Sequence, residues 1–288
     1  MKKILLFILM LVLGTVSFAE NIVITSIQPL YSLTSYLTKG TDIKVYTPFG
    51  SDTSMTMSKE AIREEGFDLS VAKKAQAVVD IAKVWPEDVI YGKARMNKIN
   101  IVEIDASYPY DEKMTTIFFS DYSNGEVNPY IWTGSKNLVR MVNIISRDLI
   151  RLYPQNKAKI EKNVNKFTND LLKLENEANE KLLSVDNPSV ISLSENLQYF
   201  LNDMNIYAEY VDYDSVTAEN IANLVRDKGI KVVISDRWLK KNVIKALKDA
   251  GGEFVIINTL DIPMDKDGKM DPEAILKGFK ENTDNLIE

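Results

Sequence analysis

The sequence predicts an α/β fold of two similar lobes, each with a mainly parallel four-stranded sheet, joined by one long rigid helix. Short apolar runs alternate with amphipathic segments along most of the chain, a pattern typical of parallel strands covered by helices. The same order of elements occurs before and after residues 154–184. That central stretch has the apolar spacing of a single helix, around which the two halves are arranged.

The central helix is predicted over 154–184. Pro154 suits a first helical position because its missing N–H would be unpaired there, and Asp186-Asn187-Pro188 ends the segment. At 1.5 Å per residue the helix is about 40 Å long, more than the radius of a small domain. A surface helix or a coiled-coil arm would show the same pattern, but the matching element order on both sides favours a spine between two lobes. The apolar stripe consists of Ile160, Val164, Phe167, Leu171, Leu174, Ala178 and Leu182.

Before this spine, four strands and three helices are predicted to alternate. The first helix covers 29–39 and ends before Gly40, Ser58 caps the second, and the third covers 86–95. The strands are expected over 21–26, 42–47, 75–82 and 99–105.

An irregular stretch over 108–132 and a helix over 135–152 lead into the spine. After the spine the alternation starts again, with Thr217 capping a helix that Gly229 ends. The strands are expected over 189–193, 206–211, 230–235 and 254–258, and the helices over 195–204, 217–228, 238–250 and 272–286.

Residues 1–19 are a predicted secretion signal. Lys2 and Lys3 precede an apolar run, and Ser17-Phe18-Ala19 is a small-x-small cleavage site. The chain has no cysteine, so it has neither a disulfide nor a cysteine for a lipid anchor, and we expect a periplasmic protein. The predicted division is a signal peptide over 1–19, an N-terminal α/β lobe over 20–134, a helical section over 135–186 and a C-terminal α/β lobe over 187–288.

The composition excludes several classes of function. The chain has no histidine and no cysteine, which removes the usual general base, the usual thiol nucleophile and the commonest metal ligand. No serine has a recognisable base partner in the sequence, so we expect a protein that is not an enzyme. The formal net charge is −6 and there is no basic run, which argues against nucleic acid as a partner.

A ligand site is expected between the lobes, because ligands of open α/β sheets bind beyond the carboxyl ends of the strands. Applied to both sheets, this rule selects the loops that follow the strands. These loops are residues 48–58, 108–132, 193–195, 236–238 and 258–261.

The chain resembles the metal-binding receptors of zinc and manganese ABC importers, the cluster A-I family, over essentially all of the sequence after residue 19. The portion that runs from NPYIW at 128–132 into LYPQN at 152–156 is the most specific. The other matching stretches are NIVITSIQPLYSLTSYL at 21–37, PFGSD at 48–52, SENLQYF at 194–200 and VTAENIANLVRDKGIKVVISD at 216–236. The resemblance implies a solute-binding receptor that acts with a membrane permease, as a monomer.

The four ligand positions that the resemblance implies are all substituted here. Ser54 and Tyr130 stand where the family has histidines, Ser194 stands in place of a histidine or glutamate, and Asn258 in place of an aspartate. Tight zinc sites need three or four His, Cys or carboxylate ligands, and these four side chains are neutral. We therefore predict that the interlobe site does not hold a metal in the usual four-ligand way.

Two alternatives for the same cleft stay open. In the first, carboxylates supply an oxygen-rich site that suits manganese, and they are Asp52, Glu195, Asp236 and Asp261. A divalent metal, zinc or manganese, would then be the transported ligand. Aromatic side chains together with the Asp236–Arg237 pair would instead suit a small organic ligand. A third hypothesis is an interaction protein or adhesin that retains the receptor scaffold without its ligand.

Overall fold

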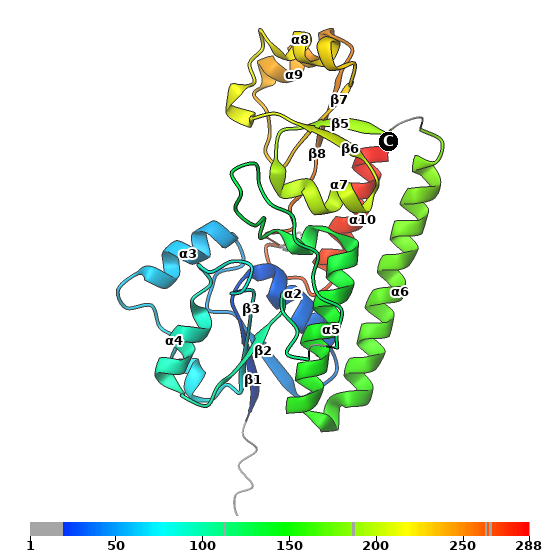
Figure 1. Cartoon of the computed structure of the whole chain (residues 1–288). Coiled ribbons are helices and arrows are strands. Elements are labelled where there is room, and N and C mark those ends of the chain that lie inside the picture. The colour runs from blue at the N-terminus through cyan, green and yellow to red at the C-terminus, as the bar shows by residue number, and fades with distance from the viewer. Residues whose placement is uncertain (1–19, 112, 186–187, 263, 265–266, 288) are drawn as a thin grey trace, which may run out of the picture.

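The computed structural model describes residues 20–111, 113–185, 188–262, 264 and 267–287. It confirms the predicted α/β architecture of two lobes, each built on a four-stranded sheet whose strands are all parallel (Figure 1). The strand order is β2-β1-β3-β4 in the first sheet and β6-β5-β7-β8 in the second, so the two sheets repeat one topology. The predicted signal peptide lies outside the described residues.

The N-terminal lobe alternates strands and helices in the predicted order. Its strands form because short apolar runs, such as the fully buried β3, can be covered on both faces. The elements are β1 (Asn21–Thr25), α2 (Gln28–Leu37), β2 (Ile43–Tyr46), α3 (Met55–Arg63), the 3-10 turn η1 (Ser70–Lys73), β3 (Ala77–Asp80), α4 (Ile90–Asn97) and β4 (Val102–Asp105).

The predicted start of the second helix was wrong. Ser54 and not Ser58 is the cap of α3, because the Ser54 hydroxyl accepts the N–H of Met57 at 3.2 Å. Ser58 lies one turn inside the helix, where its hydroxyl donates to the carbonyl of Met55 at 2.7 Å.

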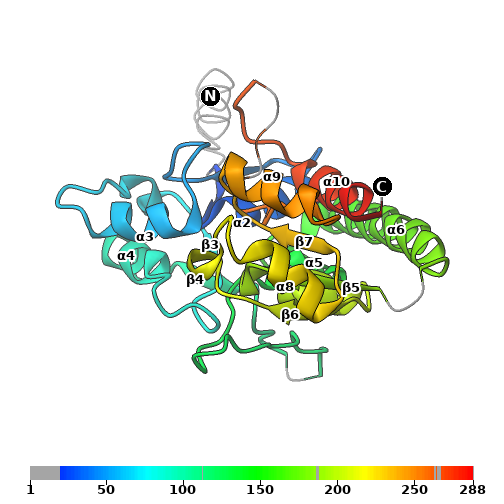
Figure 2. The ribbon, with the colours of Figure 1, turned by 90° about the horizontal axis from the view of Figure 1, so that it is seen from above.

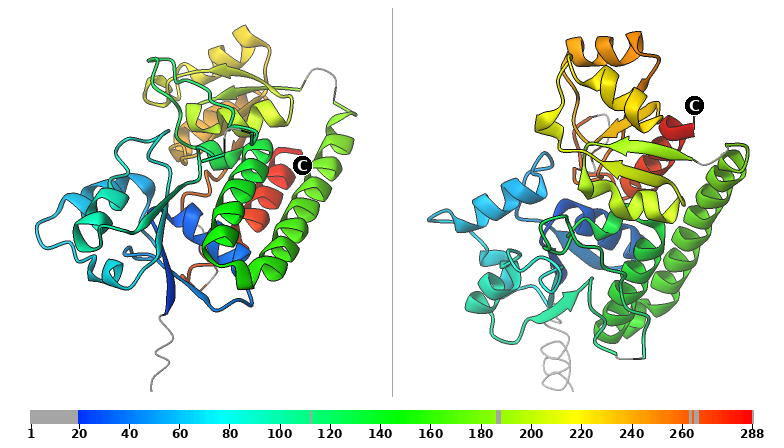
Figure 3. Two further views of the ribbon diagram at one scale, coloured as in Figure 1. Left: turned by 60° about the horizontal axis from the view of Figure 1, so that its bottom comes forward. Right: turned by 45° about the horizontal axis from the view of Figure 1, so that its top comes forward.

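Two long helices connect the lobes and lie side by side in both views of Figure 3. They are α5 (Ser135–Leu152) and α6 (Lys157–Leu182), and a 3-10 turn, η3 (Pro154–Asn156), separates them. Pro154 therefore begins this turn and not the long helix itself. α6 is the predicted spine, and its buried residues Ile160, Phe167, Leu171 and Ala178 all belong to the predicted apolar stripe.

The C-terminal lobe repeats the scheme, and Figure 2 shows α8 and α9 beside its sheet. Gly229 ends α8 with a φ of 68°, as predicted. Thr217 and Trp238, predicted to start helices, precede them instead, and Trp238 is 70% exposed. The elements are η2 (Ile131–Thr133) before α5, then β5 (Ser189–Ser192), η4 (Glu195–Leu197), α7 (Gln198–Asp203), β6 (Tyr207–Tyr210), η5 (Tyr213–Ser215), α8 (Ile221–Lys228), β7 (Val232–Ser235), α9 (Lys241–Asp249), β8 (Glu253–Ile256) and α10 (Ala274–Ile287).

The largest apolar core runs through both lobes. It extends from Val23 and Leu30 through α5 and α6 to Phe200 and Phe279, where the rings of the last two meet edge to face with centroids 5.9 Å apart. α10, the last helix of the C-terminal lobe, packs on α6 and also reaches α2 in the N-terminal lobe. The lobes are therefore held together by α10 as well as by the predicted spine.

None of the helices in the described part of the chain combines the length and the apolar character that crossing a membrane requires.

Candidate interlobe site

The N-terminal side of the site is the first turn of α3. The Met55 N–H, which follows the capping Ser54, donates to both carboxylate oxygens of Asp261, at 3.0 and 3.1 Å. Asp261 belongs to the loop after β8, so this contact joins the two lobes. A carboxylate at a helix N-terminus is favoured because the first N–H groups of the helix lack intrahelical partners.

Asp261 is almost completely buried, and burial raises the pKa of its carboxyl to about 6, although the Met55 N–H opposes that shift. The backbone turns sharply just before it, at Leu260, whose φ is 58°. The Leu260 N–H donates to the side chain of Asn258 at 2.7 Å. This turn separates the direction of Asp261 from that of Asn258.

Asn258, the fourth implied ligand position, is exposed and is tied to α10 instead of α3. Its N–H donates to the Asn282 side chain at 2.8 Å, and its carbonyl accepts from the same side chain at 2.7 Å. Of the two loop residues singled out after β8, Asp261 is therefore the one that contacts the opposite lobe through Met55.

Tyr130 lies in the field of two carboxylates. Burial is the first cause that raises the pKa of its hydroxyl, and the negative charges of Asp261 and Asp236 add to the shift. Its ring packs against Trp132 with centroids 5.2 Å apart, and the Trp132 indole N–H donates to the carbonyl of Thr259 at 2.8 Å. The NPYIW segment thus holds Tyr130 against the loop that carries Asp261.

On the C-terminal side, Asp236 follows β7 directly and Ser194 precedes η4. One carboxylate oxygen of Asp236 accepts from the Ser194 hydroxyl and from the Asn196 amide, both at 2.8 Å. Its other oxygen is buried and makes no hydrogen bond within the described residues. Asp236 is therefore oriented by neutral donors on one side only.

Arg237 does not compensate the charge of Asp236 closely. Its guanidinium Nε is 3.8 Å from the nearer Asp236 oxygen, and the group stacks over the Tyr213 ring at 4.0 Å. Arg237 is exposed.

The remaining carboxylates singled out from the sequence are directed elsewhere. Glu195 accepts the N–H of Ser123 at 2.7 Å, and Asp52 is exposed on its loop. Tyr122 donates to Asn196 at 2.7 Å and so closes the 108–132 stretch onto the C-terminal lobe. The sequence analysis did not single out Tyr122 or Asn196; Tyr122 lies in the selected loop 108–132, and Asn196 directly follows the selected loop 193–195.

The candidate site is therefore a set of polar groups at the junction of the lobes, with two acidic side chains, Asp236 and Asp261. One group comprises Asp261, the N–H of Met55 next to Ser54, and Tyr130. The other comprises Asp236 and Ser194. Across the described ranges, no three or more Asp, Glu, His or Cys side chains converge so that they could hold a metal ion.

Solved structures share this fold at low sequence identity. FpvC from Pseudomonas aeruginosa in complex with Mn2+ matches with a TM-score of 0.71 at 15% identity, over 93% of this chain and 97% of that chain. The Zn(II)-bound ZnuA-like domain of Streptococcus pneumoniae AdcA matches with a TM-score of 0.69 at 16% identity, over 93% and 100%. The metal-dependent lipoprotein YcdH from Bacillus subtilis gives 0.70 at 17% identity, over 93% and 98%. No curated protein sequence matches the chain.

The chain therefore shares its fold with these manganese- and zinc-bound structures. The model of one family, described as zinc-uptake complex component A, periplasmic, matches residues 23–288, and the chain belongs to that family.

Proposed function

We propose that the protein is the periplasmic solute-binding component of an ABC importer, that it works as a monomer with a membrane permease, and that it is not an enzyme. Its membership of the zinc-uptake family supports this role. The proposed domains are the lobes 20–134 and 187–288 on either side of the helical section 135–186, with residues 1–19 removed on export.

The interlobe site, in this proposal, does not hold zinc or manganese in a four-ligand site. The observation that carries this is the state of its two acidic groups. Asp261 is engaged by the Met55 N–H, and Asp236 by Ser194 and Asn196. Tyr130, which stands at a family ligand position, is a neutral phenol whose pKa is raised by burial and by those two carboxylates. A divalent ion would have to lose its water for a set of mostly neutral donors, which is costly.

A metal analysis tests this directly. Untagged protein purified from an exported preparation is analysed by element-resolved mass spectrometry, before and after incubation with zinc or manganese and removal of free ion. We expect less than one metal ion per several chains. A stoichiometric ion that Asp236→Asn together with Asp261→Asn abolishes would contradict the proposal.

A second candidate ligand is a small organic cation in the same cleft. Asp236 has a buried carboxylate oxygen without a hydrogen bond within the described residues, and the Tyr130 ring, near enough for the charges of Asp261 and Asp236 to raise its pKa, supplies an aromatic group. Amine and guanidine ligands combine hydrogen-bond donors for the carboxylate with attraction to the ring. A thermal-shift series with polyamines and arginine, compared with metals, distinguishes the two classes because a ligand of the native state raises the midpoint.

The importer role itself predicts that genes for a permease and an ATPase lie beside this one.

A further inference from the structure

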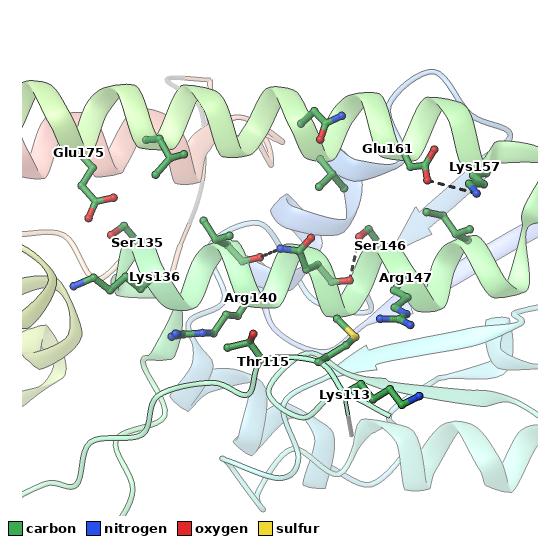
Figure 4. A pocket seen from close by; sticks show the side chains of 17 residues that line it. Lys113, Thr115, Ser135, Lys136, Arg140, Ser146, Arg147, Lys157, Glu161 and Glu175 are labelled. Atoms are coloured by element: carbon green, nitrogen blue, oxygen red, sulfur yellow. Dashed lines mark hydrogen bonds and ion pairs between the residues drawn. The ribbon is translucent and has the colours of Figure 1, made fainter. Parts of the chain in front are cut away.

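A long groove runs along the connecting helices, away from the interlobe site. It lies between α5 and α6, is closed on one side by Lys113, Met114 and Thr115, and has a volume of about 970 Å³ (Figure 4). Along α5 it extends from Ser135 to Ile150, which at 1.5 Å per residue is about 22 Å. None of the proposed cleft residues lines it. We call this surface the helix groove.

The helix groove has the opposite charge to the rest of the protein. The chain carries a net charge of −6, yet the groove is lined by five cationic side chains and two acidic ones. The cations are Lys113, Lys136, Arg140, Arg147 and Lys157, and the anions are Glu161 and Glu175. Between these charges lie the apolar side chains of Met114, Val139, Ile150, Val164 and Leu172.

Three of the five cations already have acidic partners. Lys157 lies 3.7 Å from Glu161, Arg147 lies 2.6 Å from Asp111, and Lys136 lies 3.3 Å from Asp203. Arg140, near the middle of the groove, has no carboxylate within 4 Å in the part of the chain that the structure describes. Its guanidinium stacks on the Phe118 ring at 3.8 Å, and partial burial lowers its pKa. One outer nitrogen, Nη1, donates to the side chain of Asn137 at 3.4 Å. Stacking on the ring fixes the direction of the remaining guanidinium N–H groups, which stay available to a ligand.

The apolar surface continues past the Lys136 end of the groove. A second hollow of about 240 Å³ shares Lys136 with the groove and is lined by Phe118 and Phe119. These two phenylalanines are 57% and 51% exposed. Large aromatic side chains beside an arginine are the composition of protein-binding surfaces, and exposed aromatics at adjacent positions are costly unless something covers them.

We propose that the helix groove binds an acidic, partly apolar segment of another protein. Glutamate or aspartate side chains of that segment pair with the Arg140 guanidinium and with Lys113, while its apolar side chains cover Val139, Met114 and Phe118. A helix of about 14 residues matches the length of the groove. The surface is independent of whatever the interlobe cleft binds.

Two fluorescently labelled peptides of this length test the proposal. Both have leucines at the same helical spacing, and the polar positions are all glutamate in one and all lysine in the other. We expect saturable binding of the glutamate peptide by fluorescence anisotropy, weakening as salt is raised, and no binding of the lysine peptide. Arg140→Gln should weaken the glutamate peptide about tenfold, the effect of losing a charge-assisted pair.

The matched control is Arg95→Gln on α4. Arg95 is exposed and, like Arg140, lies over a ring, that of Tyr91 at 5.8 Å, but outside the helix groove. The Arg95→Gln substitution removes the same charge as Arg140→Gln and should leave binding of the glutamate peptide unchanged. Absence of saturable binding, or equal weakening by the two substitutions, would overturn the proposal. So would concentration-dependent dimers in sedimentation velocity that Arg140→Gln abolishes, since the occupant would then be a second copy of this chain.

Discussion

The two sheets have the same topology, but they bury different side chains at the carboxyl end of the third strand. β3 ends in Asp80 and β7, which has the same place in the second sheet, ends in Ser235. Both side chains are completely buried. The N-terminal lobe therefore holds an acid where the C-terminal lobe holds a hydroxyl.

Asp80 belongs to a group of buried carboxyls in the N-terminal lobe. Neither of its carboxylate oxygens makes a hydrogen bond within the described residues. Burial, followed by the charges of Asp88 and Asp105, raises the pKa of Asp80 well above its ordinary range. Burial likewise raises the pKa of Asp88 to about 6, against the hydrogen bond from Ser26.

In the C-terminal lobe the acid comes one position later and is hydrogen-bonded. The Ser235 hydroxyl accepts the N–H of Arg237 at 3.1 Å, and Asp236 is held by Ser194 and Asn196. The comparison teaches that the scaffold does not require a buried acid at this edge, so the acids of the N-terminal lobe are a local cost to stability and not a condition of the fold.

The largest expected effect comes from copying the acid into the second lobe. Ser235→Asp places a carboxyl in a fully buried position, and should lower the free energy of unfolding by about 3 kcal/mol at neutral pH. Urea unfolding measures it. The conservative Ser235→Ala should cost clearly less, and equal losses would show that packing and not charge decides.

The reverse substitution should stabilise the protein. Asp80→Asn keeps the shape and removes the ionisation, and we expect a gain of about 2 kcal/mol at pH 7. Its control is Asp52→Asn, an exposed aspartate of the same lobe, which should change stability little. A loss of stability in Asp80→Asn would mean that the ionised acid is required.

The same groups set a pH dependence of stability. Because burial raises the pKa values of Asp80, Asp88 and Asp261, these three groups bind more protons in the folded state than in the unfolded chain above pH 3.8. Their contribution to the free energy of unfolding should therefore fall as pH rises through the window from about 4 to about 6 that Asp88 and Asp261 define. Chemical unfolding at pH 5 and pH 7 measures this, and Asp80→Asn should flatten the decline. The same pH dependence in Asp80→Asn as in the unsubstituted protein would contradict it.

The smallest expected effect concerns the two serines that donate to these acids. Ser26 bonds the buried Asp88, and Ser194 bonds the less buried Asp236. Ser26→Ala should cost about 1.5 kcal/mol and Ser194→Ala about 1 kcal/mol, since a lost donor matters more where water cannot replace it. The reverse order in urea unfolding would mean that Asp88 is held mainly by backbone N–H groups such as that of Ile81.

Most strands and helices could be predicted from the sequence, because apolar runs and helical spacing are local signals. The start of α3 could not, since Ser54 and Ser58 are equally good caps in isolation. The contact that accompanies the choice of Ser54 joins Met55 to Asp261, a residue 206 positions away. Long-range contacts of this kind leave no mark in a local pattern.

The candidate site was predictable as a set of loops but not as a geometry. Asn258 and Asp261 follow the same strand, and the left-handed conformation of Leu260 separates their directions. Similarly, Glu195 is engaged by the backbone of Ser123, which no spacing indicates. Which acids contact the opposite lobe depends on such backbone details, whereas which loops lie at the carboxyl ends of the strands depends only on strand order. The roles of these residues in binding remain predictions.

The packing of α10 on α2 has a consequence for the order of folding during synthesis. The Ser32 hydroxyl on α2 donates to the carbonyl of Asp271, 239 positions later, and Lys39 pairs with Glu273 at 3.0 Å. Although α5, α6 and its own sheet also pack on α2, this part of the first helix is covered only once nearly the last residues have been made. A nascent or prematurely terminated chain keeps that part of α2 exposed, and surfaces left exposed in this way are bound by chaperones or lead to aggregation.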